Sequence, residues 1–379
     1  MKIEQRIWTP EGGWRAGGPG GLGAQAQLVL LFWENELFHR DDVAAEVRKA
    51  YPRAHLAGCS TAGEIIGPEV LDEALTVTAI HFESAAVQAA GVTLRPGESS
   101  RAAGQRLAAA LDAKHLVHVL VFSDGLQVNG SELVAGLTAG LPPGVSLTGG
   151  LSADGPRFKS TRVLLEGRPR VGAVAAIGLS GDRLRVGYGS LGGWDPFGPE
   201  RTITRSAGNV LYELDGRSAL DLYKLYLGDY ARDLPSSGLL FPLLVRAPAE
   251  ERGVVRTILA VDEHAQSMTF AGDMPSGAYA RLMRANFDRL IDGAAGAARV
   301  NQQALAGQAA DLAILISCVG RKLVLGQRTE EEVDAVRDVL GADTALTGFY
   351  SYGEISPMTP GARCELHNQT MTITTMSEI

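Results

Sequence analysis

One pattern recurs three times along the chain and restricts its fold more than any other feature. In each copy an apolar run is followed by a helix-like stretch, and then by a second strand that carries a glycine and ends in polar residues. An apolar residue and this glycine are separated by 27, 28 and 33 residues in the three copies, at Leu31–Gly58, Val121–Gly149 and Leu315–Gly348. Similar spacing with similar residue chemistry predicts repeated α/β units.

The predicted elements follow the same order in each copy. Short continuous apolar runs are typical of strands that are buried on both faces of a sheet. Apolar residues four apart predict the helices, and Thr329 with Glu332 forms a capping-box pattern at the start of the third. The predicted elements cover residues 26–34, 41–51, 55–65 and 74–84, then 116–125, 131–141, 146–155 and 171–181, and finally 311–320, 329–340, 346–356 and 367–376. The predicted fold class is α/β, with repeated strand–helix–strand–strand units forming mixed sheets in two related, packed domains.

Glycine-rich and proline-rich stretches predict the domain boundaries. Residues 12–23, GGWRAGGPGGLG, contain seven glycines, so residues 1–25 are predicted to be a flexible tail. A second such stretch, GSLGGWDPFGPE at 189–200, separates a predicted domain over 26–200 from one over 201–379. In the later domain we expect a strand, turn and helix over 208–228, a hairpin and loop over 253–277, and a long alanine-rich helical region over 279–307.

Composition excludes several classes of protein. The net charge of −8 argues against a nucleic-acid surface, because phosphate binding needs clustered Lys and Arg. No apolar run is long enough to span a bilayer, and no signal peptide follows the N-terminal Lys2 and Arg6. Three widely spaced cysteines fit reduced thiols better than a disulfide framework. These features predict a cytoplasmic protein without membrane insertion.

The polar residues that follow the strands are the candidate site. In α/β sheets, ligands collect beyond the carboxyl ends of the strands. Two copies share the ending G-E-I, in HLAGCSTAGEI (55–65) and LTGFYSYGEIS (346–356), which favours a role for Glu64 and Glu354 beyond turn formation. Small hydroxyls, tyrosines, carboxylates and cations suit a small polar ligand that carries an amine and a carboxylate. The candidates are Cys59, Ser60, Thr61, Glu64, Ser123, Asp124, Ser152, Asp154, Ser317, Cys318, Arg321, Lys322, Tyr350, Tyr352 and Glu354. For any one of these turns, ordinary turn chemistry is the alternative.

Enzyme patterns are weak in this sequence. GYGSLG at 187–192 matches a dinucleotide-binding pattern, but the prolines that follow prevent the helix that this site requires. Neither a phosphate-binding P-loop nor a G-x-S-x-G elbow occurs. Cys59 would need a histidine base close in space to act as a nucleophile, so we expect binding without catalysis.

The histidines leave a haem alternative open. Their spacing contains neither H-x-x-x-H nor C-x-x-C, which argues against a structural metal site. A single histidine can still ligate haem axially, and His367 and His264 are the candidates for that role. A hydrogen-bonded strand or turn histidine is the alternative for both.

Six stretches, in this order, resemble one known family. They are GCSTAGEI, TGGLSADG, GNVLYELDGRSALDLY, AILISCVGRKLVLG, GFYSYGEISP and LHNQTMTITTM, and they are similar to the paired N- and C-terminal FIST domains. The resemblance runs from about residue 25 to the end of the chain. It maps the family's motifs onto Gly58–Glu64, Gly348–Glu354 and His367–Thr370, which adds Asn368 to the candidate ligand residues.

The resemblance implies a prokaryotic intracellular sensory module that binds small ligands such as amino acids. It implies partners such as a histidine kinase of a two-component system, a chemoreceptor or a cyclic-di-GMP enzyme, and a subset of similar proteins binds haem. No segment is left over for an output domain, so we expect regulation of a partner in trans. The alternatives are a haem-binding nitric-oxide sensor that acts on a histidine kinase and, less favoured, an enzyme that uses Cys59 or the paired glutamates.

Overall fold

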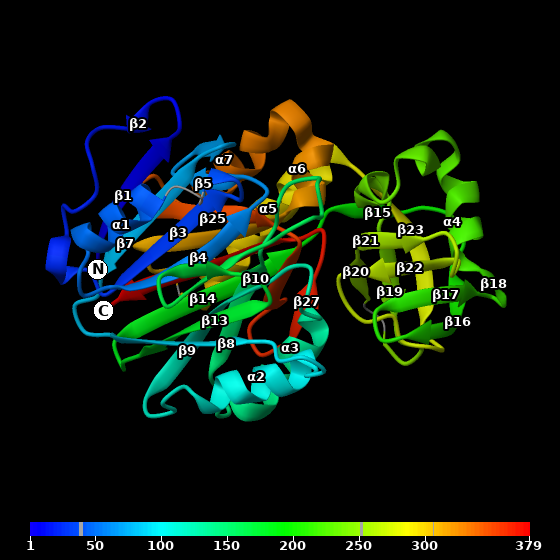
Figure 1. Cartoon of the computed structure of the whole chain (residues 1–379), viewed down its shortest axis with the longest axis horizontal. Helices are drawn as coiled ribbons and strands as arrows, with labels where there is room; N and C mark the ends of the chain where they lie inside the picture. Colours follow the sequence, from blue (N-terminus) through cyan, green and yellow to red (C-terminus); the bar gives the residue numbers. More distant parts are fainter. Residues whose placement is uncertain (38–40, 251–252, 306) are drawn as a thin grey trace.

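The computed structural model describes residues 1–37, 41–250, 253–305 and 307–379, and it shows two lobes of unequal size (Figure 1). The larger lobe contains both chain ends and three of the four sheets, and the smaller lobe is built from residues between 194 and 285. Among the described residues, no helix is long and apolar enough to cross a membrane.

Three units of the same topology form the larger lobe, which confirms the repeated α/β units. In each unit two parallel strands are joined through helical structure, and an antiparallel strand pairs with the first of them. The first unit contains β3 (Leu28–Glu34), α1 (Asp41–Ala50), β4 (His55–Thr61) and β7 (Leu75–His81). The second contains β9 (Leu116–Ser123), α3 (Gly130–Gly140), β10 (Ser146–Leu151) and β13 (Ala173–Ser180). The third contains β24 (Leu312–Cys318), α6 (Val319–Leu325), α7 (Thr329–Leu340), β25 (Ala345–Ser351) and β28 (Met371–Glu378).

A fourth strand and further helices complete these units. The added strands are β1 (Lys2–Thr9), β8 (Ala86–Thr93) and β14 (Leu184–Leu191), which pair with β7, β13 and β28 respectively. Helix α2 (Ser100–Ala109) packs on α3, and α5 (Phe287–Ala304) packs on α7 and on β14. Short β2 (Gly13–Trp14) extends the sheet beyond β1, and the 3-10 turns Gly23–Gln25 and Gly326–Arg328 precede β3 and α7.

The recurring glycine has the same geometric role in each unit. The residue pairs whose spacing marked the repeats are cross-strand partners, namely Leu31↔Gly58, Val121↔Gly149 and Leu315↔Gly348. Each glycine has a positive φ, of 148°, 153° and 159°. A Cβ atom there would lie only 1.8, 1.9 and 1.8 Å from the carbonyl oxygen of the partner residue, so no other residue fits.

Each unit gives a short strand to the sheet of another unit, in a closed cycle. After β4, the first unit contributes β5 (Glu64–Ile66) to β25 of the third unit. After β25, the third unit contributes β26 (Gly353–Pro357) to β10 of the second. After β10, the second unit contributes β11 (Val163–Leu165) to β4 of the first. Antiparallel β6 (Glu69–Leu71), β12 (Arg168–Arg170) and β27 (Cys364–His367) extend these three exchanged strands.

The carboxyl ends of the three parallel pairs meet where this exchange begins. The Ala62 amide donates to the carbonyl of Tyr350 at 2.9 Å, the Tyr352 amide to Leu151 at 3.3 Å, and the Ala153 amide to Ser60 at 2.9 Å. These bonds join equivalent positions and complete a ring of three units. Beneath the ring, the aromatic side chains of Phe32, Phe122 and Phe349 pack together with ring centroids 4.8–6.1 Å apart. The predicted residues at the strand ends are therefore brought into one region.

The smaller lobe is a nine-stranded antiparallel arrangement with its own apolar core. Its strands are β15 (Trp194–Pro196), β16 (Arg201–Ala207), β17 (Val210–Leu214), β18 (Arg217–Ser218), β19 (Leu243–Arg246), β20 (Val254–Arg256), β21 (Ile258–Asp262), β22 (Ser267–Phe270) and β23 (Tyr279–Ala285). Helix α4 (Ala219–Leu227) and the 3-10 turns Gly228–Asp233 and Ser236–Leu240 pack beside them. Residue 200 lies between β15 and β16, and both strands belong to this lobe.

Three local predictions are wrong. Residues 1–25 are not simply a tail, because Lys2–Thr9 forms β1 and pairs with β7 over seven residues. The helical region predicted over 279–307 begins with β23, whose Ala280 and Leu282 face the core, and only Phe287–Ala304 is helical. Thr329 does not cap α7: its hydroxyl donates to the Gly326 carbonyl, and no side chain caps that helix.

Candidate functional site

A pocket of about 430 Å³ lies where the three units meet, beside the ring of strand ends. Its residues come from the ends of β3 and β4, from β5, from the turn before β7, from the loop after β10, and from α6. They are Glu34, Thr61, Ala62, Gly63, Glu64, Asp72, Glu73, Gly155, Pro156, Arg157, Val319, Lys322, Leu323 and Gly326. We call this the Glu64 pocket.

Glu64 is fully buried and only half satisfied. The Thr61 hydroxyl donates to Oε1 of Glu64, while Oε2 is buried and has no hydrogen-bond partner of ordinary geometry among the described residues. Burial raises the pKa of the Glu64 carboxyl to about 8, although the Thr61 hydrogen bond, the charge of Lys322 and the Ala74 amide act in the opposite direction. A buried carboxylate oxygen without a partner is costly, so Glu64 offers an acceptor, or a proton, to a molecule in the pocket.

Lys322 supplies the positive charge of the Glu64 pocket. It extends from α6, donates to the Ala62 carbonyl at 2.8 Å, and pairs with Asp72. Its ammonium also lies 5.4 Å from the centroid of the Tyr350 ring. Gly63 has a φ of 138°, which favours glycine, and a Cβ atom there would lie 2.3 Å from Nζ of Lys322 and displace that side chain.

An ion pair connects two further walls of the pocket. Arg157, in the loop after β10, pairs at 2.5 Å with Glu34 at the end of β3. The pocket thus contains three acidic side chains besides Glu64, namely Glu34, Asp72 and Glu73, and two cationic ones, Lys322 and Arg157. A molecule with both an ammonium and a carboxylate would find partners for both groups here.

A buried ion pair joins α6 to α7. Arg321 and Glu332 are both fully buried and are joined by two hydrogen bonds, of 3.0 and 2.8 Å. The hydroxyls of Ser317 and Tyr350 both donate to Glu332, at 2.9 and 2.7 Å respectively. Arg321 also donates to the Leu290 carbonyl at 2.7 Å. The predicted ligand residues Ser317, Arg321 and Tyr350 thus satisfy one another and Glu332, and they do not line the Glu64 pocket.

The second G-E-I glutamate occupies the equivalent position at another junction but is fully bonded. Ser351 donates to Oε1 of Glu354 at 2.5 Å, as Thr61 does to Glu64. The other oxygen, Oε2, accepts from the Thr370 hydroxyl at 2.9 Å and from the Thr370 amide at 3.2 Å. Burial still raises the pKa of Glu354 to about 8. The two turns therefore face different surroundings, and Glu354 does not line the Glu64 pocket.

Several other predicted residues hold the strand ends together. Asp124 accepts bonds from the amides of Leu126, Gln127 and Gly172, and Ser123 donates to the Asp124 carbonyl. Asn368 joins the Tyr352 carbonyl to the Thr257 amide.

Four predicted residues surround the ring of strand ends. Ser60 donates to the Ala153 carbonyl at 2.8 Å. Tyr352 donates to Asp154. Cys59 packs in the apolar core, and the Ser152 hydroxyl is buried without a partner among the described residues. Of the predicted residues, only Thr61, Glu64 and Lys322 line the Glu64 pocket.

The two histidines of the haem alternative lie apart from the Glu64 pocket. Nε2 of His367 is 2.8 Å from the Ser356 carbonyl, and burial lowers the pKa of His367 to about 4. His264 is exposed in the turn between β21 and β22.

Sequence reasoning missed the other charged residues of the Glu64 pocket. Glu34 ends a correctly predicted strand, and that position alone could have identified it. Asp72 and Arg157 lie in loops whose sequence gives no sign of their meeting. Glu332 was interpreted as part of a capping box, whereas its partner is Arg321.

Family models place the chain among known sensory domains. The FIST N domain matches residues 27–217, and the FIST C domain matches residues 219–357. The chain therefore belongs to the FIST family, whose domains are sensory domains of signalling proteins. This confirms the resemblance seen in the sequence.

Other comparisons are weaker. No curated protein matches the chain. Among known structures, cyanuric acid hydrolase from A. caulinodans is similar at 8% identity and a TM-score of 0.38, over 100% of this chain and 98% of that one. A second cyanuric acid hydrolase structure is similar at 12% identity and a TM-score of 0.31, over 100% and 99%. At these TM-scores neither likeness indicates a shared reaction.

Proposed function

We propose that this FIST protein senses a small zwitterionic metabolite in the Glu64 pocket and regulates a signalling partner in trans. The observation that carries the proposal is the buried Oε2 of Glu64, which has no hydrogen bond of ordinary geometry to the described residues, in a pocket that also holds Lys322 and Arg157. An ammonium group of the ligand would bind Glu64, and a carboxylate group would bind one of the two cations. An amino-acid-like molecule has both groups.

The raised pKa of Glu64 gives this proposal a characteristic pH dependence. Below pH 8 the carboxyl holds a proton, and an ammonium ligand must displace it. Affinity should therefore rise as the pH increases from 6 to 8, and binding should release a proton. Calorimetric titrations in buffers of different ionisation enthalpy measure that release directly.

The chain contains a matched control for the test. Glu64→Gln should weaken binding of the amino acid selected in a thermal-shift screen by at least about tenfold, the usual consequence of losing a charged hydrogen bond. Glu354→Gln changes the same G-E-I motif at a junction where both carboxylate oxygens are already bonded. Equal losses in both variants would refute binding at the Glu64 pocket.

The proposal involves binding without turnover. Cys59 is buried among apolar side chains, and that burial raises the pKa of its thiol well above the ordinary value, which disfavours the reactive thiolate. Recovery of the screened ligand unchanged after prolonged incubation tests this point. A histidine kinase, a chemoreceptor or a cyclic-di-GMP enzyme is the kind of partner that family membership suggests, in a cytoplasmic setting.

A further inference from the structure

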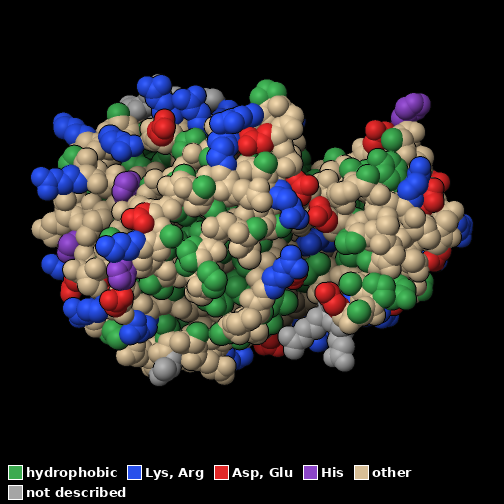
Figure 2. Space-filling model, turned by 90° about the horizontal axis from the view of Figure 1, so that it is seen from below, with side chains coloured by type: hydrophobic (Ala, Val, Ile, Leu, Met, Phe, Trp, Pro, Cys, Tyr) green, Lys and Arg blue, Asp and Glu red, His purple; other side chains and the backbone are tan. Residues whose placement is uncertain are grey.

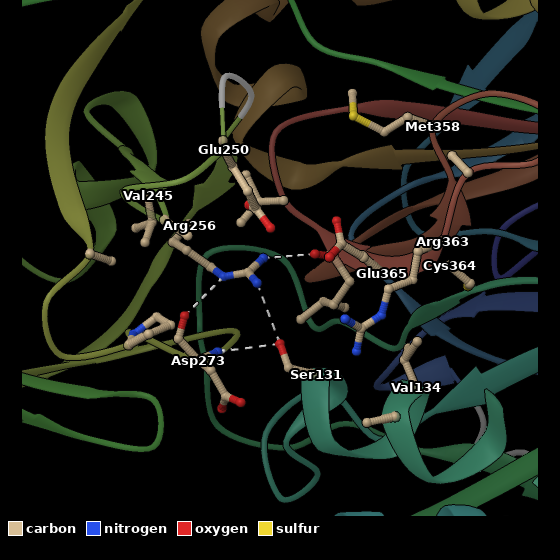
Figure 3. Close-up of a pocket in the computed structure, with 18 of the residues that line it drawn as sticks. Ser131, Val134, Val245, Glu250, Arg256, Asp273, Met358, Arg363, Cys364 and Glu365 are labelled. Carbon is tan, nitrogen blue, oxygen red and sulfur yellow. Dashed lines mark hydrogen bonds between the residues drawn. The ribbon is translucent and has the colours of Figure 1, made fainter. Parts of the chain in front are cut away.

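A second, larger cavity of about 750 Å³ lies between the two lobes, away from the Glu64 pocket. Figure 2 shows the surface hollowed there, with basic and acidic side chains along the hollow. The first turns of α3, strands β19 and β20 of the smaller lobe, the loop after β22, and β27 form its walls (Figure 3). We call this cavity the interlobe groove.

Arg256 of β20 lies at the centre of the interlobe groove (Figure 3). Its side chain is only 6% exposed, and it crosses from the smaller lobe toward the larger one. Its nitrogens donate to the carbonyl of Leu366 at 2.7 Å, to the carbonyl of Asp273 at 3.3 Å and, weakly, to the Ser131 hydroxyl at 3.5 Å. All three acceptors are neutral, and two of the five guanidinium N–H groups have no acceptor among them.

The charge of Arg256 is not neutralised by direct contact. Among the described residues, none of the hydrogen bonds of its guanidinium goes to a carboxylate, and Oδ1 of Asp273 accepts instead from Asn129 at 2.8 Å. Burial lowers the pKa of Arg256 to about 10, although the negative charges of Asp273 and Glu365 act in the opposite direction, and the guanidinium stays protonated at neutral pH. A buried cation without a bound anion is unfavourable, so an anion in the groove would relieve that cost.

Two further features favour an anion at this point. Ser131 lies in the first turn of the 11-residue helix α3, whose partial positive charge attracts anions, although Asn129 already caps this end and Glu132 lies in the same turn. Arg101, Arg363 and Glu250 are exposed at the rim of the groove, and Glu365 lies beside Arg363 (Figure 3). The lining as a whole holds three arginines, including Arg256, and three carboxylates, including Asp273, so its charges balance and the groove suits a single anionic group rather than a polyanion.

The rest of the lining is aliphatic. Val134 of α3, Val245 of β19, Val254 of β20 and Leu366 of β27 form apolar walls on both lobes. A ligand with an apolar body would bury that body here, while its anionic end binds the guanidinium.

We propose that the interlobe groove binds a small organic anion, a carboxylate or a phosphate monoester with an apolar body, whose anionic group takes the two remaining N–H groups of Arg256. Because the walls come from both lobes, the occupant contacts both, and its binding is coupled to how they pack. This site is independent of the Glu64 pocket, so either proposal can fail alone.

The test is calorimetric titration of the full chain with three probes, namely inorganic phosphate, phenyl phosphate and hexanoate. We expect one-to-one binding of at least one organic probe, more tightly than inorganic phosphate, and the better of the two identifies the anionic group. Arg256→Met should weaken that binding by at least about tenfold, and Arg363→Gln by about two- to threefold. Arg205→Gln, which removes an equal charge outside the groove, should leave it unchanged.

Three results would overturn the proposal. They are no saturable binding of any probe, binding of inorganic phosphate that is as tight as that of the organic probes, and unchanged affinity in Arg256→Met. Thermal unfolding shows whether Arg256→Met is folded. If it is not, the double change Ser131→Ala with Arg363→Gln replaces it, and unchanged affinity in that variant refutes the site equally.

Discussion

The two buried G-E-I glutamates should make the protein less stable as the pH rises toward 8. Burial raises the pKa of both Glu64 and Glu354 from 4.5 to about 8. Between these values the folded chain holds protons that the unfolded chain has released, so the free energy of unfolding falls with increasing pH. The stabilising contribution is complete below pH 4.5 and is lost by pH 8.

Two buried histidines act in the opposite direction at lower pH. Burial lowers the pKa of His118 from 6.5 to about 3 and that of His367 to about 4. Below pH 6.5 the unfolded chain protonates these histidines while the folded chain keeps them neutral, so the free energy of unfolding rises as the pH increases to 6.5. Above pH 6.5 that effect is complete, and the two glutamates dominate. One pKa unit corresponds to 1.36 kcal/mol, so each glutamate should remove about 2 kcal/mol between pH 6.5 and 8.

Urea unfolding followed by tryptophan fluorescence measures this difference. The native chain should lose about 4 kcal/mol between pH 6.5 and 8, each single Glu→Gln variant about 2 kcal/mol, and the double variant almost nothing. If Glu64→Gln loses as much as the native chain, Glu64 is already ionised at pH 6.5. Lys322 would then compensate its burial, and the reasoning about this carboxyl would be wrong.

Three further changes test the packing of the larger lobe. Glu332→Gln should lower the free energy of unfolding by about 3–5 kcal/mol because it leaves Arg321 buried without its counter-charge, and adding Arg321→Met should recover part of the loss in urea unfolding. In the same assay Gly149→Ala should lower the free energy of unfolding by about 3–5 kcal/mol because the new Cβ would meet a carbonyl oxygen. Gly67→Ala, at a φ of 54° with open space around it, should lower it by about 1 kcal/mol, and equal losses would contradict this account. Removing residues 1–9 deletes β1, so amide exchange should accelerate along β7, and unchanged protection there would show that β1 contributes little.

The sequence predicted the units well because their signals are local. Each unit is marked within about 35 residues by apolar runs of strand length, a helix-like spacing of apolar residues and a glycine at a fixed distance. In the structure Gly58, Gly149 and Gly348 pair with the expected partners. Strand β1 escaped prediction because its sequence, KIEQRIWT, has three polar residues in a row between Ile3 and Ile7, without the alternation of a half-buried strand, and lies next to a glycine-rich stretch.

Long-range partners could not be predicted from these local signals. The exchanged strands β5 and β11 are three residues long, and nothing in three residues specifies a partner far along the chain. The same limit applies to Glu332: its spacing from Thr329 fits a helix cap, but Arg321 offered a stronger interaction in the buried interior. The repeated G-E-I turn indicates Glu64 from the sequence, whereas Arg157 and Asp72 come to the pocket only when the chain folds, and no local pattern predicts them.

The cyclic exchange of strands has a consequence for dividing the chain. A cut between residues 217 and 219 separates the two family domains, yet β14 on one side pairs with β28 on the other, β5 pairs with β25, and β26 pairs with β10. Each fragment alone would present open sheet edges, which favour aggregation. Produced together, the fragments should reassemble by complementation, so this fold lends itself to a split reporter in which neither half functions alone.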